Sequence, residues 1–184
     1  MLGDGAAEDE QPTPVWANGQ GWLVSWHRAS NPPDGTPHGA EGVCLTTAGE
    51  VVLVSQDGDR WSLPAGRPEH GETWEDTLRR EVLEEACARV LTARLLGFCR
   101  GVCVAGPEQG LVLVRSIWRA EVDLEPWEPR FEIRHRRLVA QREVTDHLGI
   151  GSHPFARILR RTLYEAAINI GSTAQVEQVM DADG

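Results

Sequence analysis

Residues 66–88 read GRPEHGETWEDTLRREVLEEACA, and this stretch decides the fold. Its second half places carboxylates at Glu81, Glu84 and Glu85, positions i, i+3 and i+4 that share one face of a helix. Like charges at this spacing repel by about 0.2–0.5 kcal/mol per pair. A hard divalent cation reverses that repulsion, because Mg²⁺ prefers oxygen ligands and is held by a few carboxylates together with substrate phosphates. The residues therefore indicate a Mg²⁺ or Mn²⁺ site, against the alternative of a solvated acidic helix face.

The residues around these acids predict a strand, a loop and a helix in succession. Residues 61–66 are a short apolar stretch closed by Pro and Gly, which indicates a strand that breaks into a turn. Thr73 is expected to be the N-cap of a helix over residues 73–88, with Glu75 and Asp76 complementing the helix dipole in the first turn. The buried stripe is predicted to consist of Trp74, Leu78, Val82 and Ala86. The carboxylates border this stripe, so the helix presents them at a defined edge.

This pattern resembles the signature of the Nudix hydrolase family. That signature is Gly, five residues, Glu, seven residues, Arg-Glu, an aliphatic residue, any residue, Glu-Glu, any residue, Gly and an aliphatic residue. The residues at the matching positions are Gly66, Glu72, Arg80, Glu81, Val82, Glu84 and Glu85. Cys87 departs from it by replacing the final Gly, and Ala88 is a small version of the last aliphatic residue. Cys87 leaves the helix ending open, since Gly would permit a left-handed terminus at no steric cost.

The resemblance implies an α/β fold, a Nudix-like α/β/α sandwich around a mixed β-sheet, and a metal-dependent site. Glu84 and Glu85 are then the direct metal ligands, and Glu81 is either a third ligand or the base that activates water. The carbonyl of Ala65 or Gly66 could complete the coordination of the ion.

Two further residues of the signature receive supporting roles by the same resemblance. Arg80 is expected to pair with a signature acid and hold it in place, against the alternative of an ordinary helix salt bridge. Glu72 resembles the structural acid near the loop.

Candidates outside the signature rest on weaker grounds. Glu132 follows a strongly apolar strand, in a region from which family members often draw an extra carboxylate ligand; a surface acid, or Glu128 in its place, is the alternative. His70 could reach a phosphate from the signature loop. The nearby arginines Arg130, Arg134, Arg136 and Arg137 could recognise phosphate through their planar forks, or form a solvated strand edge. One of the tryptophans Trp16, Trp22, Trp26, Trp118 and Trp127 could stack on a base, although packed core is the usual role.

Composition narrows the class of protein. The chain has 184 residues and a net charge of -10, which argues against a nucleic-acid polymer as partner because such binding needs a basic footprint. No apolar run reaches the length of a membrane span, and no signal peptide is recognisable. The four cysteines lack the two close ligand pairs of a structural zinc site, so reduced, buried thiols in the cytoplasm are the better interpretation.

The chain divides into four expected segments. They are an acidic disordered tail over residues 1–14, an N-terminal strand and Pro/Gly loop over 15–37, the Nudix hydrolase domain over 38–171, and a flexible C-terminal tail over 172–184. Strands are predicted over residues 21–27, 41–46, 50–56, 61–63, 90–104, 111–122 and 133–139, and a last helix after His153 and Pro154.

The sequence thus predicts a cytoplasmic, Mg²⁺-dependent pyrophosphohydrolase. Its substrate would be a small nucleotide, a nucleoside diphosphate linked to another moiety: a nucleotide sugar, ADP-ribose or a non-standard nucleoside triphosphate. A catalytically weak, nucleotide-binding sensor domain is the alternative, although the usual mark of such a domain is a lost signature acid. A homodimer could form through the N-terminal strand and exposed tryptophans. The particular substrate, the number of metal ions and the identity of the base stay open, because fold does not fix function.

Overall fold

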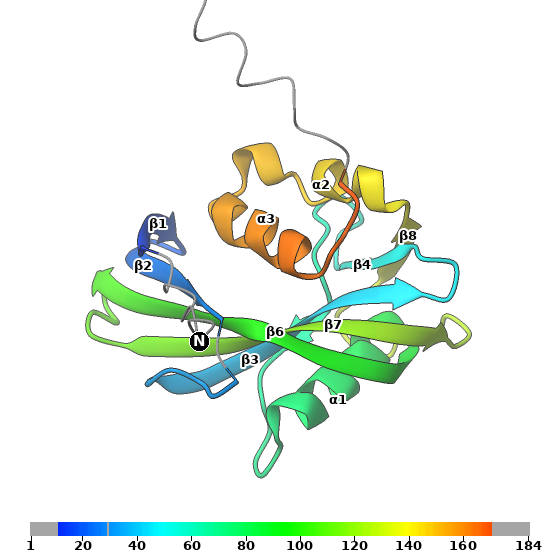
Figure 1. Ribbon diagram of the computed structural model, residues 1–184, viewed down its shortest axis with the longest axis horizontal. Coiled ribbons are helices and arrows are strands. Elements are labelled where there is room, and N and C mark those ends of the chain that lie inside the picture. The colour runs from blue at the N-terminus through cyan, green and yellow to red at the C-terminus, as the bar shows by residue number, and fades with distance from the viewer. Residues whose placement is uncertain (1–10, 29, 171–184) are drawn as a thin grey trace, which may run out of the picture.

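A mixed eight-stranded sheet forms the centre of the computed structural model, which describes residues 11–28 and 30–170 (Figure 1). Its strands are β1 (Thr13–Ala17), β2 (Gln20–His27), β3 (Thr36–Thr46), β4 (Val51–Ser55), β5 (Ala65–Gly66), β6 (Ala88–Ala105), β7 (Val112–Leu124) and β8 (His135–Val139). The strand order is β1-β2-β6-β7-β3-β4-β8, and β5 pairs with β3. The pair of β3 and β7 is parallel, whereas the other pairs are antiparallel.

Helices cover both faces of this sheet. Helix α1 (Trp74–Ala86) lies on one face, and α2 (Val144–His147) and α3 (Ala156–Glu165) lie on the other (Figure 1). Two 3₁₀ turns, η1 (Gln141–Glu143) and η2 (Ile150–Ser152), flank α2. The architecture is an α/β/α sandwich, which confirms the fold that the resemblance implied.

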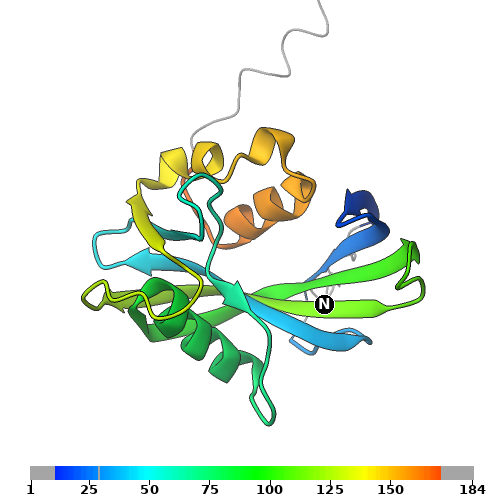
Figure 2. The same ribbon diagram turned by 180° about the vertical axis from the view of Figure 1, so that it is seen from behind.

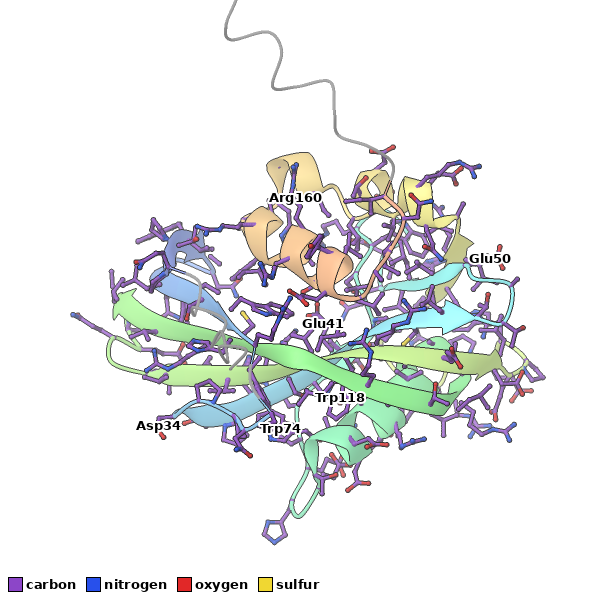
Figure 3. The ribbon with its side chains drawn as sticks, viewed as in Figure 1. Asp34, Glu41, Glu50, Trp74, Trp118 and Arg160 are labelled. Atoms are coloured by element: carbon purple, nitrogen blue, oxygen red, sulfur yellow. The ribbon has the colours of Figure 1, made fainter. Side chains whose placement is uncertain are left out.

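The alternation of side chains along the strands builds two hydrophobic cores. On β3, Ala40 and Cys44 face α1, whereas Val43 and Leu45 face α3. Figure 3 shows the same division, with Glu41 on the α3 side of the sheet and Trp118 on the α1 side. A Cβ at Gly42 would lie 2.8 Å from Leu78 Cδ1, so the missing side chain lets α1 pack directly on β3.

Local sequence sets the start of α1 and its buried stripe. The Thr73 side chain accepts a hydrogen bond from the Asp76 backbone N–H, and the Asp76 side chain accepts one from the Thr73 N–H, which completes a capping box. The predicted N-cap is therefore confirmed. Leu78, Val82 and Ala86 are fully buried as the stripe predicted. Trp74 is only half-buried, in edge contact with another aromatic ring.

The N-terminal segment belongs to the central sheet. Strand β1 begins at Thr13, inside the region expected to be a disordered tail, and pairs with β2, which pairs in turn with β6. The presence of Pro14 is compatible with this strand, since proline is tolerated at a sheet edge. Residues 1–10 of that expected tail and the expected C-terminal tail at 172–184 lie outside the described residues.

Most predicted strands are present, and several are longer than expected. Strand β3 begins five residues before the expected start at residue 41, because Thr36 and Pro37 already pair with β7. The strand expected over residues 61–63 is reduced to a single bridge between Ser62 and Val54. The helical turns over residues 141–152 were not predicted, because each is too short to show a helical period.

The cysteines are free thiols in the described structure. Cys44, Cys87 and Cys103 are buried and Cys99 is partly buried, in agreement with the interpretation as apolar core residues. Burial raises the pKa of Cys44 to about 12, so that thiol stays protonated. Within residues 11–28 and 30–170, no helix has the length and apolarity needed to span a bilayer.

Cys87 is the residue at which α1 ends, and its φ of 45° and ψ of 53° place it in the left-handed region. That conformation costs a non-glycine residue roughly 1–2 kcal/mol. We expect Cys87→Gly to raise the free energy of unfolding, by up to about 1 kcal/mol after the loss of the buried thiol and the greater chain entropy of glycine. Denaturant unfolding followed by circular dichroism measures the change.

Cys87→Ala is the matched control, because it removes the same thiol and keeps the left-handed strain. The glycine variant should be the more stable of the two. Equal stability of both variants would contradict the strain at this position.

Candidate active site

Arg80 is the centre of the acidic face of α1. Its Nε donates to Glu72 Oε1 at 2.7 Å and its Nη2 to Glu72 Oε2 at 3.1 Å. Its Nη1 donates to Glu81 Oε1 at 2.8 Å and to Glu84 Oε2 at 3.1 Å. Nη2 also donates to the carbonyl of Arg67 at 2.8 Å, which ties the signature loop to the helix. The hydrogen bonds from Arg80 lower the pKa of Glu72 to about 2.

Glu85 is held differently, because it turns away from Arg80 toward β5. Its Oε2 accepts a hydrogen bond from the backbone N–H of Ala65 at 2.9 Å. Burial, assisted by the charges of Glu81 and Glu132, raises the pKa of Glu85 to about 7. Burial also raises the pKa of Glu81. Two carboxylates thus lie where a negative charge is poorly solvated and an added cation would be favourable.

Gly66 has a steric role at this site. A Cβ at this position would lie 1.9 Å from the carboxyl carbon of Glu81 and 1.9 Å from its Oε1, closer than any van der Waals contact. The Glu81 carboxylate therefore occupies the space that any other residue at position 66 would fill. The carbonyl oxygen of Gly66 lies against Gly39 of β3, where an added Cβ would be 2.9 Å away.

The donor set suits a hard divalent ion by its chemistry. Glu81, Glu84 and Glu85 carry carboxylate oxygens at one edge of α1, and such oxygens are the ligands that Mg²⁺ prefers. Within residues 11–28 and 30–170, no three acidic, histidine or cysteine side chains already converge in ligand geometry. In the described structure Glu81 and Glu84 accept hydrogen bonds from Arg80, whereas Glu85 accepts one from the backbone N–H of Ala65.

The loop after β7 carries Glu132 and Glu128, the two candidate acids outside the signature. Glu132 is exposed, and its charge raises the pKa of both Glu81 and Glu85. Glu128, its alternative, is exposed and pairs with Arg130 at 3.4 Å. The electrostatic contact with the signature acids therefore distinguishes Glu132 from Glu128.

Two of the expected arginines, Arg136 and Arg137, lie on opposite faces of the sheet, because neighbouring residues of a strand alternate between the faces. Arg136 Nη1 donates to the carbonyls of Ala86, Cys87 and Glu125 at 2.8, 3.0 and 3.2 Å, so it closes the C-terminal end of α1. Arg137 lies over Trp61, with its guanidinium carbon 4.2 Å from the ring centroid.

The remaining candidates are Arg134, His70 and the tryptophans. The side chain of Arg134 is exposed, and its backbone N–H donates to Ser55. His70 is exposed in the turn at residues 70–71. Among the tryptophans, Trp26 and Trp118 are buried in the cores and Trp16 is exposed.

A cavity of about 500 Å³ adjoins the acidic face. It lies on the α3 side of the sheet, and both Ala65 and Glu85 line it, so the cavity and the acids share a boundary. Its other lining residues include Trp22, His38, Glu41, Trp61, Cys99, Arg115, His153 and Phe155. The segment between β4 and α1 runs from the α3 side of the sheet to the α1 side and so connects the two regions (Figure 2).

Apart from Glu85, the charged residues that line this cavity were not predicted from the sequence. Arg115 Nη1 donates to Glu41 Oε2 at 2.9 Å, in a partly buried ion pair between β7 and β3. A signal was present for Glu41, which is the one carboxylate of a mostly apolar β3, whereas Arg115 is one of four charged residues of β7. Burial lowers the pKa of both His38 and His153, which favours neutral imidazoles near pH 7 and leaves the positive charge to Arg115.

Comparison with known proteins agrees with this geometry. The sequence profile of the NUDIX domain matches residues 36–162. No curated protein sequence matches the chain significantly.

Solved structures with the same fold share little sequence with the chain. A mutant of the pyrophosphohydrolase BsRppH from Bacillus subtilis aligns with a TM-score of 0.64 at 20% identity, over 86% of this chain and 95% of that one. A NUDIX hydrolase from Nitrosomonas europaea aligns with a TM-score of 0.55 at 21% identity, over 72% and 91% of the two chains. A MutT protein from Methanosarcina mazei Go1 aligns with a TM-score of 0.50 at 15% identity, over 69% and 92%.

At sequence identities of 15–21%, these structures show only that the chain shares their fold. The profile, by contrast, covers well over half of the chain and includes every signature residue from Gly66 to Glu85. Together with the sandwich fold and the acid edge of α1, that match shows that this chain belongs to the Nudix hydrolase family.

Proposed function

We propose that the protein is a Mg²⁺-dependent hydrolase that cleaves the pyrophosphate bond of a nucleoside diphosphate linked to another moiety. The observation that carries the proposal is the complete acid edge of α1, which borders a cavity large enough for a nucleoside. Glu85 belongs to both regions, because it lines the cavity and accepts the Ala65 N–H.

Each residue of the site has a role that its contacts support. Glu84 and Glu85 would hold the metal ion, and Mn²⁺ could replace Mg²⁺ because both take oxygen ligands. When bound, such an ion neutralises charge on the phosphates and lowers the pKa of water. Glu81 is either a third ligand or the base that takes a proton from the attacking water.

Arg80 acts through the acids that it binds. Its guanidinium fixes Glu72 at the loop and keeps Glu81 and Glu84 within hydrogen-bond distance of one group. The catalytically weak sensor has no observation in its favour, since all signature acids are present.

Two features of the wider molecule fit the proposal. The free thiols suit a reducing compartment, which supports a cytoplasmic protein. Strand β1 is the edge of the sheet and carries Trp16, which is 67% exposed, so a homodimer through this edge is proposed as the assembly.

A phosphate-release screen with Mg²⁺ and Mn²⁺ across nucleotide sugars, ADP-ribose, dinucleoside polyphosphates and modified nucleoside triphosphates tests the activity.

Glu85→Gln should abolish most of the activity. The amide keeps the size of the side chain and can still accept the Ala65 N–H, so the fold should be retained. The loss of the charge should lower kcat by at least about 100-fold, as expected when one electrostatic group of a reaction site is removed. Glu75→Gln is the control, because Glu75 lies on the same helix and pairs with Arg79 instead. Equal activity of the two variants would contradict the role of Glu85.

Gly66→Ala should displace the Glu81 carboxylate, because the new Cβ needs the space that this group fills. A flexible side chain can move away, so the melting temperature should change little. A displaced catalytic group should cost roughly 10- to 100-fold in rate. Gly151→Ala is the control, since a Cβ at Gly151 meets nothing within 4 Å. An alanine variant at position 66 with full activity would show that Glu81 does not need this position.

Glu132→Gln should lower the rate and weaken the apparent affinity for Mg²⁺, because a second ion would need a carboxylate from outside α1. Titration of activity with Mg²⁺ measures both effects. Glu128→Gln, in the same loop, should have neither effect. The same Mg²⁺ dependence in both variants would remove Glu132 from the site.

A further inference from the structure

The cavity contains a polar group that the stability of the fold does not require. The Glu41 and Arg115 side chains are 16% and 32% exposed, and Val24, Ile117 and Leu159 are among the residues around them. A partly buried ion pair of this kind contributes little net stability, because an apolar pair of similar volume is often as favourable. Its presence in a cavity that borders the signature acids therefore points to a ligand.

The position of the pair is fixed by the sheet. Arg115 of β7 is the register partner of Gly39, where a Cβ would lie 3.1 Å from Arg115 Nε, so the guanidinium extends across β3. Glu41 lies two residues further on β3, on the same face, and receives one hydrogen bond from Arg115. The described contacts of Glu41 leave a carboxylate oxygen available to a ligand.

The walls of the cavity are aromatic. Trp22 packs against Gly101 of β6, where a Cβ would lie 3.4 Å from Trp22 Cε3. Trp61 is backed by Arg137, whose guanidinium covers the ring at 4.2 Å and holds it in place. Phe155 lines the cavity at the start of α3. Such walls favour a flat heterocycle, because stacking of a base on an aromatic ring contributes about 1–3 kcal/mol.

One end of this cavity reaches the acids. Glu41 is the register partner of Ala65, and the Ala65 N–H binds Glu85. A ligand whose ring meets Glu41 and Arg115 can therefore extend its phosphates past β5 toward the signature acids.

We propose that this cavity binds the nucleobase of the substrate and that Glu41 and Arg115 select guanine. Guanine carries two neighbouring N–H donors, at N1 and at the exocyclic amine, next to the O6 acceptor. A carboxylate can accept both donors while an arginine donates to O6. Hypoxanthine offers the carboxylate N1–H alone, adenine offers one amino group, and uracil offers one N–H. This inference rests on the proposed function, for which it names the substrate class.

Binding of nucleoside monophosphates tests the proposal without hydrolysis, because these ligands contain no pyrophosphate bond. Isothermal titration calorimetry should show GMP binding at least about 10-fold more tightly than IMP, AMP or UMP, the loss expected for one charge-assisted hydrogen bond. The comparison with IMP isolates the exocyclic amine. Equal affinities for GMP and IMP, or no saturable binding of any of the four, would overturn the proposal.

Glu41→Gln should bring the ratio of GMP to IMP affinity close to one, because the amide keeps an acceptor for Arg115 and loses an acceptor for guanine. Glu121→Gln is the control, since Glu121 is an exposed residue of β7 that contacts Thr92 and does not line the cavity. If Glu41→Gln unfolds, the double variant Glu41→Gln with Arg115→Met removes both charges together and should also lose the preference. An unchanged preference in a folded variant would refute the role of the pair.

The two proposals fail in different ways. A preference for GMP without hydrolysis of any guanine nucleotide would support the base site and refute the proposed activity. Hydrolysis with equal rates for guanine, adenine and uracil nucleotides would refute the base site and leave the activity in place.

Discussion

The site depends on the contact of one guanidinium with three carboxylates. Glu72, Glu81 and Glu84 would repel one another at the spacing that α1 and its loop impose, and Arg80 offsets this repulsion with hydrogen bonds to all three. Because the same guanidinium binds the carbonyl of Arg67, the loop and the helix are held as one unit. Glu85 receives no hydrogen bond from Arg80 in the described structure, and burial disfavours its anionic form. The acid edge is thus stable enough to form, yet still favours an additional cation.

The sheet gives the acids and the cavity different environments. Helix α1 covers one face and α3 the other, so residues two apart on β3 and β7 share a face and neighbouring residues do not. The acid edge lies on α1, while Glu41, which pairs with Arg115, lies on the α3 side of the sheet, where Figure 3 labels it. Strand β5 links them, since Ala65 pairs with Glu41 and donates to Glu85. The signature pattern therefore specifies more than the acids. Because Gly66 has no side chain, β5 can pack closely against the helix.

Local sequence was sufficient to predict α1 with its N-cap, its buried stripe and its acid edge, because all of these depend on residues within one turn of each other. It was also sufficient for most strands. The neighbouring positions of Arg136 and Arg137 in a predicted strand imply opposite faces of the sheet, but the groups that each side chain contacts depend on the tertiary structure. Local sequence could not pair Glu41 with Arg115, because 74 residues separate them and only the parallel register of β3 and β7 brings them together. The position of Glu132 could be predicted only in part. The strand before its loop is predictable, but tertiary contacts set the direction of the loop.

The three carbonyls that Arg136 binds have a consequence for local unfolding. The last turn of a helix normally frays first, because its carbonyls lack partners within the helix. Here Arg136 of β8 satisfies the carbonyls of Ala86 and Cys87 and that of Glu125, and it stacks on Trp127 with its guanidinium carbon 5.2 Å from the ring centroid. Opening of the end of α1 therefore breaks the hydrogen bonds that connect it to Arg136 of β8 and, through Arg136, to the segment at Glu125. In hydrogen exchange these three segments should behave as one cooperative unit, so that the distance between the helix acids and the loop acid is preserved through ordinary thermal fluctuations.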